Sequence, residues 1–106
     1  MSNLHVLCTC PDDGPTADSI ASALVAERLA ACVNRLPGVK STYRWQDEVR
    51  HDTEALLLIK TTRERFDALR ARILALHPYE LPEIIAVDIA LGLDRYLSWI
   101  AAETRP

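Results

Sequence analysis

The chain has 106 residues, 49% of them hydrophobic and 25% charged, with a net charge of −3 at neutral pH. We expect residues 1–106 to form one globular domain with its own core. The negative balance argues against nucleic acid as a partner, because phosphate binding needs a basic surface. No run of about eighteen apolar residues is present, which argues against a membrane protein. Together with an N-terminus that lacks a signal-peptide pattern and an odd number of cysteines, this favours a cytoplasmic protein with reduced thiols.

The first predicted strand covers residues 4–10, with Val6, Cys8 and Cys10 on one face, and it ends at the turn sequence PDDGP. A helix is predicted over residues 15–31, where apolar residues recur at steps of three and four. The proline at its start suits a first helical turn.

A β-hairpin is predicted next. After the sequence LPG, residues 39–45 alternate between apolar and polar side chains, and residues 49–60 read as the returning arm. The sequence QDE forms the tip. The tip has Asp47, and aspartate adopts a left-handed turn more easily than most residues but less easily than glycine.

The second half of the chain predicts a helix, a strand and a helix. Thr61 or Thr62 can cap the first of these helices, whose apolar residues form one stripe. His77 ends that helix, because the residue before a proline is disfavoured in helical geometry. Residues 84–91 alternate as the last strand, and residues 94–103 form a short C-terminal helix.

This order of elements predicts an α+β fold, the ferredoxin-like split βαβ sandwich with a C-terminal helix. The right-handed crossover rule places the first and third strands at the centre of an antiparallel sheet. Both faces of the third strand are apolar, with Leu56 and Leu58 on one and Leu57 and Ile59 on the other. Since the helices cover one face only, we expect a second copy of the chain to cover the other.

The same topology brings distant segments to one end of the sheet. Cys8 and Cys10 lie there with His77, Glu83 and the hairpin tip. A thiolate, an imidazole and a carboxylate within reach of one another can hold a divalent transition metal, and sulfur and nitrogen favour copper or zinc over magnesium or calcium. This prediction rests on the topology, because the sequence has no C-x-x-C or H-x-x-x-H spacing.

Each residue also has a structural interpretation. Cys8 and Cys10 can be small buried hydrophobes, and His77 can interact as a cation with the C-terminal end of its helix. Glu83 can be a salt-bridge partner or a solvated residue. Cys32 is expected in the core at the end of the first helix.

Two other classes of function are disfavoured by the sequence. A nucleophilic Cys–His enzyme needs an exposed cysteine with a lowered pKa, whereas these cysteines lie between apolar neighbours in a strand. RNA-recognition modules share the strand and helix order, but they stack bases on aromatic residues of the central strands. This chain has Val6, Cys8, Leu56 and Leu58 there.

Six ordered blocks of the sequence resemble the divalent-cation tolerance (CutA) family over nearly the whole chain. These blocks are LCTCPD at 7–12, ERLAACVN at 27–34, PGVKSTYRW at 37–45, LLLIKTT at 56–62, HPYELPEI at 77–84 and YLSWI at 96–100.

The resemblance implies a ferredoxin-like homotrimer that is held together by hairpin strands and catalyses no reaction. It also implies binding of a divalent metal, copper foremost, with zinc or another divalent cation as the alternative. By position, it places the metal ligands on Cys8 and His77, with Glu83 nearby. Cys10 stands where a compared family member has alanine, and it could add a second thiol. The alternative is a module resembling the PII signalling proteins, which bind small ligands between subunits, or a trimer that anchors another protein, with metal binding incidental.

Overall fold

The computed structural model describes residues 2–106, whose four strands form one antiparallel sheet. Along the sheet the strands follow the order β2-β3-β1-β4. The bounds of the strands are Asn3–Pro11 for β1, Cys32–Trp45 for β2, Glu48–Thr62 for β3 and Ile84–Asp88 for β4. The central position of β1 and β3 and the ferredoxin-like topology are therefore as predicted.

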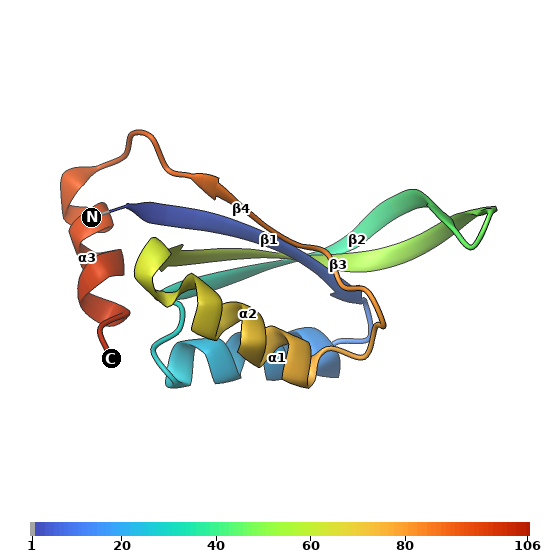
Figure 1. Ribbon diagram of the computed structural model, residues 1–106, viewed down its shortest axis with the longest axis horizontal. Helices are drawn as coiled ribbons and strands as arrows, with labels where there is room; N and C mark the ends of the chain where they lie inside the picture. The colour runs from blue at the N-terminus through green and yellow to red at the C-terminus, as the bar shows by residue number, and fades with distance from the viewer. Residues whose placement is uncertain (1) are drawn as a thin grey trace.

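Two helices cover one face of this sheet (Figure 1). They are α1, Pro15–Ala26, and α2, Phe66–Leu76. A third helix, α3, spans Asp94–Glu103 and lies at the end of the sheet where β1 begins, where the Asn3 side-chain amide donates to the Leu97 carbonyl at 3.0 Å. No helix of residues 2–106 is long and apolar enough to cross a membrane.

The hydrophobic core lies between the sheet and helices α1 and α2. Alternate residues of the two central strands point into it, and the apolar stripes of the helices meet them there. The fully buried core side chains are Val6, Cys8, Cys10, Ile20, Leu24, Leu57, Ile59, Leu69 and Ile73.

The opposite face of the sheet is also apolar and has no helix over most of its area. We call this surface the open face; its apolar side chains are those of Leu7, Leu36, Leu56, Leu58, Ile85 and Val87. Leu36, Ile85 and Val87 are 46, 52 and 49% exposed. The prediction that the third strand is apolar on both faces is confirmed.

Strands β2 and β3 continue past the rest of the sheet as a long hairpin arm (Figure 1). Its tip turns through Gln46 and Asp47, whose φ angles of 50° and 65° are left-handed. Two such residues in succession form the turn that best matches the twist of a two-stranded arm. The register of β2 and β3 shifts between Leu36 and Val39. Gly38 lies in this shift with φ 72°, which glycine adopts without strain.

Helix α1 is shorter than predicted. It ends at Ala26, and Arg28 turns the chain with a left-handed φ of 59°. The backbone N–H groups of Leu29 and Ala30 both donate to the Leu24 carbonyl, which caps the helix. Ala30 and Ala31 follow this turn and are buried, and the Ala31 N–H donates to the Lys60 carbonyl of β3, so their apolar spacing does not report a helix. Consequently Cys32 begins β2 and is half-buried rather than part of the core.

Two other boundaries differ from the prediction. Strand β3 continues to Thr62, and a 3-10 turn at Arg63–Arg65 precedes α2, so neither threonine caps that helix through its side chain. Strand β4 ends at Asp88, three residues earlier than the alternation suggested. Ile89 still donates its N–H to the Asn3 carbonyl, but the chain then leaves the sheet for α3.

Candidate functional site

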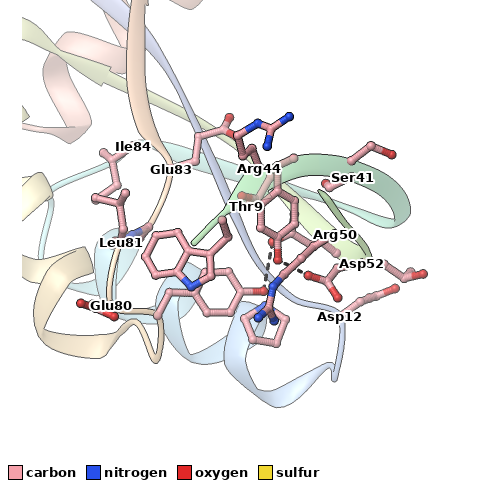
Figure 2. A pocket seen from close by; sticks show the side chains of 18 of the residues that line it. Thr9, Asp12, Ser41, Arg44, Arg50, Asp52, Glu80, Leu81, Glu83 and Ile84 are labelled. Carbon is pink, nitrogen blue, oxygen red and sulfur yellow. Dashed lines mark hydrogen bonds between the residues drawn. The ribbon is translucent and has the colours of Figure 1, made fainter. Parts of the chain in front are cut away.

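A groove of about 1130 Å³ lies at the end of the sheet where the sequence predicted distant segments to converge. One wall is the hairpin arm and the other is the connection from α2 to β4. Figure 2 shows Glu80 and Leu81 of the connection on one side and Arg50 and Asp52 of the arm on the other. The convergence of these segments is confirmed.

The groove is negatively charged. It is lined by six carboxylates and two guanidinium groups, contributed by Asp12, Asp13, Asp52, Glu54, Glu80, Glu83, Arg44 and Arg50. Three aromatic side chains, Tyr43, Trp45 and Tyr79, add apolar surface. An excess of carboxylates favours cationic over anionic ligands, so the groove is a poor site for a nucleotide phosphate.

His77 is fixed beside the groove by hydrogen bonds to both ring nitrogens. It ends α2 with an extended backbone, as expected before Pro78, and it is only 8% exposed. The Tyr79 backbone N–H donates to Nδ1 at 3.1 Å, so Nδ1 accepts and Nε2 carries the proton. Nε2 lies 2.7 Å from the Thr9 carbonyl, to which it donates. In this arrangement neither ring nitrogen has a free lone pair.

Tyr79 connects this histidine to the hairpin. Its ring lies against the His77 ring, with 4.7 Å between centroids, and its hydroxyl donates to Glu54 Oε2 at 3.0 Å. Burial, followed by the hydrogen bond to this carboxylate, raises the pKa of the Tyr79 phenol well above its usual value. The phenol therefore stays protonated and remains a donor at physiological pH.

Cys8 and Cys10 lie beneath the groove, on the core side of β1. Burial, then the neighbouring Cys10 and the carboxylates of Glu83 and Glu54, raises the pKa of Cys8 to about 12. Burial and the Asp13 carboxylate, with smaller effects of Glu54 and Asp12, raise the pKa of Cys10 to about 11. Both are therefore protonated thiols at neutral pH, and neither is activated as a nucleophile.

The three predicted ligands reach the same end of the sheet but do not form a preassembled metal site. Cys8 is fully buried, His77 uses both nitrogens, and Glu83 is exposed at the edge of the groove. Across residues 2–106, no three His, Cys, Asp or Glu side chains are positioned together to hold a metal ion. Metal coordination by these residues requires His77 to release a hydrogen bond and Cys8 to lose its proton.

The sequence reasoning missed Glu54, whose buried carboxylate accepts from Tyr79. A signal was available, because alternation along the third strand places Glu54 on the same face as Leu56 and Leu58. A carboxylate at the edge of an apolar face usually has a hydrogen-bond partner. The two arginines of the hairpin were also missed, since they look like ordinary solvated residues in an alternating strand.

The fold and the groove define a ferredoxin-like protein of the split βαβ class with an acidic groove beside an overhanging hairpin. Residues 4–103 match the family model described as CutA1 divalent ion tolerance protein. The chain belongs to this family.

Two named relatives match this chain over most of its length. It is 54% identical over 99 residues to the divalent-cation tolerance protein CutA of Thermus thermophilus, covering 93% of this chain and 95% of that protein. A CutA protein of Arabidopsis thaliana, named as chloroplastic, is 44% identical over 81% of this chain, which spans 47% of that longer protein.

Solved structures show the same fold. The Thermus thermophilus divalent cation tolerance protein superposes with a TM-score of 0.94 at 52% identity, over 97% of this chain and 99% of that chain. A structure named PII-like protein CutA from Nostoc superposes with a TM-score of 0.87 at 34% identity, over 99% of this chain and 98% of that chain. Relatives named for divalent-cation tolerance support a role in metal tolerance, and the family is named for that role rather than for a reaction.

Proposed function

We propose that this protein acts in metal tolerance by binding a divalent transition metal, copper foremost with zinc as the alternative, through Cys8, His77 and Glu83. The observation that carries this proposal is the convergence of a thiol, an imidazole and a carboxylate beside an acidic groove. The six carboxylates attract cations to the groove. The thiol and the imidazole then favour copper or zinc over magnesium and calcium.

Binding at these residues is coupled to two local changes. The metal replaces the thiol proton of Cys8, so binding weakens as pH falls. The His77 ring gives up its bond from the Tyr79 amide or its bond to the Thr9 carbonyl, which frees one nitrogen for the metal. Because the Tyr79 ring packs on His77, metal binding should also change the Tyr79 environment.

The second part of the proposal is a homotrimer in which the open face is covered by other copies of the chain. Full burial of a leucine-sized side chain stabilises by about 1.5–3 kcal/mol. Leu36, Ile85 and Val87 are each about half exposed, so covering them would contribute roughly 2–4 kcal/mol per subunit. The overhanging arm provides an edge strand, β2, for pairing between copies.

A second candidate function is the binding of a small ligand in the groove, as in a PII-like signalling module, or anchoring of a partner protein. The size of the groove and its aromatic lining favour the small ligand. The solved relative that carries the name PII-like has the same fold. The excess of carboxylates in the groove of this chain favours a cationic ligand over a nucleotide.

The remaining parts of the proposal concern the chain as a whole. We place it in the cytoplasm, because its three cysteines are all free thiols, as is usual in a reducing compartment. Residues 1–106 act as one domain without catalytic activity, since the buried thiols lack the lowered pKa of a nucleophile.

Calorimetric titration of the reduced, metal-free protein with Cu(I), Cu(II) and Zn(II) tests the proposal, with His77→Gln and Cys8→Ser as variants. About one metal per subunit is expected for the wild type, with at least tenfold weaker binding in both variants. His51→Gln is the matched control, because His51 lies on the exposed hairpin. Binding that is unchanged in both ligand variants would reject these ligands, and the groove would then be screened with small organic cations.

A further inference from the structure

A polar row crosses the apolar open face. His5 on β1 lies directly opposite Lys60 on β3 and, on its other side, opposite Val87 on β4. The next row along the sheet contains Leu58 and Leu7, paired with each other. An imidazole and an ammonium group therefore sit side by side at the border of the apolar surface.

One ring nitrogen of His5 has no hydrogen-bond partner among residues 2–106. This atom, Nε2, is shielded from solvent. Lys60, in contrast, donates from Nζ to the Asn34 side chain on β2. If His5 were protonated, both ring nitrogens would carry an N–H group that needs an acceptor, and the imidazolium charge would lie beside the Lys60 ammonium.

The other neighbours of His5 do not offset a positive charge. Val87 on β4 is apolar, and Asp88 next to it points to the helix-covered face, where it is paired with Arg63. On β2, the residue opposite Lys60 is the Cys32 thiol. From α3, the Tyr96 phenol contacts Cys32, and this group is neutral at physiological pH because burial raises its pKa.

We propose that the His5 and Lys60 pair makes self-association of this chain sensitive to acid. The neutral imidazole allows a second copy to cover the open face, whereas the imidazolium opposes it. This inference rests on the assembly proposed above and adds that pH regulates it.

The sign of the effect follows from proton linkage. Burial, followed by the charge of Lys60, lowers the pKa of His5 from its usual value of 6.5. Covering the face removes more water and reduces screening, so the pKa falls further in the assembly. At pH values near and below the lowered pKa of the separated chain, that chain binds more protons than the assembled chain, so assembly weakens as pH falls through this lowered pKa. With one His5 per subunit, the logarithm of the trimer dissociation constant rises by up to about three for each pH unit.

Sedimentation velocity between pH 5.5 and 8 measures this dependence, in chelator and reductant so that metal and thiol chemistry do not contribute. The His5→Val variant retains a strand-compatible side chain but cannot be protonated. The Lys60→Met variant keeps the length of the side chain and removes the charge. Arg70→Gln is the control, because Arg70 lies on α2, away from the open face and the hairpin arm, where it pairs with Asp67.

The expected result is an assembly that dissociates in acid for the wild type and for Arg70→Gln. The dependence should be absent in His5→Val and reduced in Lys60→Met. A wild-type assembly whose dissociation constant does not change with pH would overturn the inference. An unchanged pH dependence of the dissociation constant in His5→Val would also overturn it, because this variant still contains His51 and His77. A chain that is monomeric throughout this range would instead overturn the proposed assembly.

Discussion

The hydroxyl of Tyr79 donates to the buried carboxylate of Glu54 at 3.0 Å, and this contact ties the α2–β4 connection to the central strand β3. The connection is held at its other end by the His77 ring, which donates to β1. Both contacts position the wall of the acidic groove. Rigidity of this segment therefore depends on two polar side chains rather than on its prolines alone.

Tyr79→Phe should destabilise the protein by about 1–3 kcal/mol, because the buried Glu54 carboxylate loses its donor. Chemical denaturation at pH 7 measures the change in the free energy of unfolding. Tyr43→Phe is the control, since this exposed tyrosine donates to Asp52 in solvent, and its denaturation midpoint should stay at the wild-type value. Equal midpoints for the two variants would show that the Glu54 carboxylate is solvated.

Alkaline pH should destabilise the fold through Cys8 and Cys10. Their pKa values are raised to about 12 and about 11 from 9.0, so between these values the unfolded chain has lost protons that the folded chain retains. The stability that these thiols contribute is complete below pH 9 and decreases as pH rises above it. Denaturation at pH 7, 9 and 10 measures this slope. A Cys8→Ala and Cys10→Ala double variant should have a shallower slope, and an unchanged one would contradict the burial argument.

Asp47→Gly should stabilise the hairpin tip by about 0.5–1 kcal/mol, because Asp47 has a left-handed φ of 65°. Thermal unfolding monitored by circular dichroism reports the change as a higher Tm. Asp47→Val, which places a β-branched residue in the same conformation, should lower the Tm. If both variants shifted the Tm in the same direction, backbone strain at the tip would not be the cause.

Leu58→Lys should prevent self-association by placing a charge at the centre of the open face. Size-exclusion chromatography with light scattering should show a smaller species than the wild type. Leu74→Lys is the control, because Leu74 is 53% exposed on the outer surface of α2, away from the open face. Loss of assembly in the control alone would place the interface on the helices.

The strand and helix order was predictable from the sequence because each core element repeats its apolar residues at its own period. The alternation in β1 is an example. The end of α2 was predictable for a different reason, because His77 precedes Pro78 and is disfavoured in helical geometry. The end of α1 was not predictable in this way, because its capping turn uses Arg28 with a positive φ instead of glycine. Alanines beyond that turn are compatible with a helix by composition, and only the tertiary structure shows that they are packed elsewhere.

The candidate site was predictable as a meeting of segments but not as a set of contacts. Strand direction alone brings Cys8, His77 and Glu83 to one end of the sheet. Which lone pairs are free depends on side-chain orientation, and the bond from the Tyr79 amide to His77 has no signature in the sequence. The pairing of Tyr79 with Glu54 joins residues from two segments, so a local pattern does not reveal it.

The hairpin arm also has a consequence for how the protein is made. β2 is an edge strand with unpaired backbone groups, and it adjoins an apolar surface. A newly synthesised copy therefore presents a template for strand addition by other chains. The yield of correctly folded protein should consequently depend on how fast copies accumulate, because aggregation through unpaired strand edges and apolar surface increases with chain concentration.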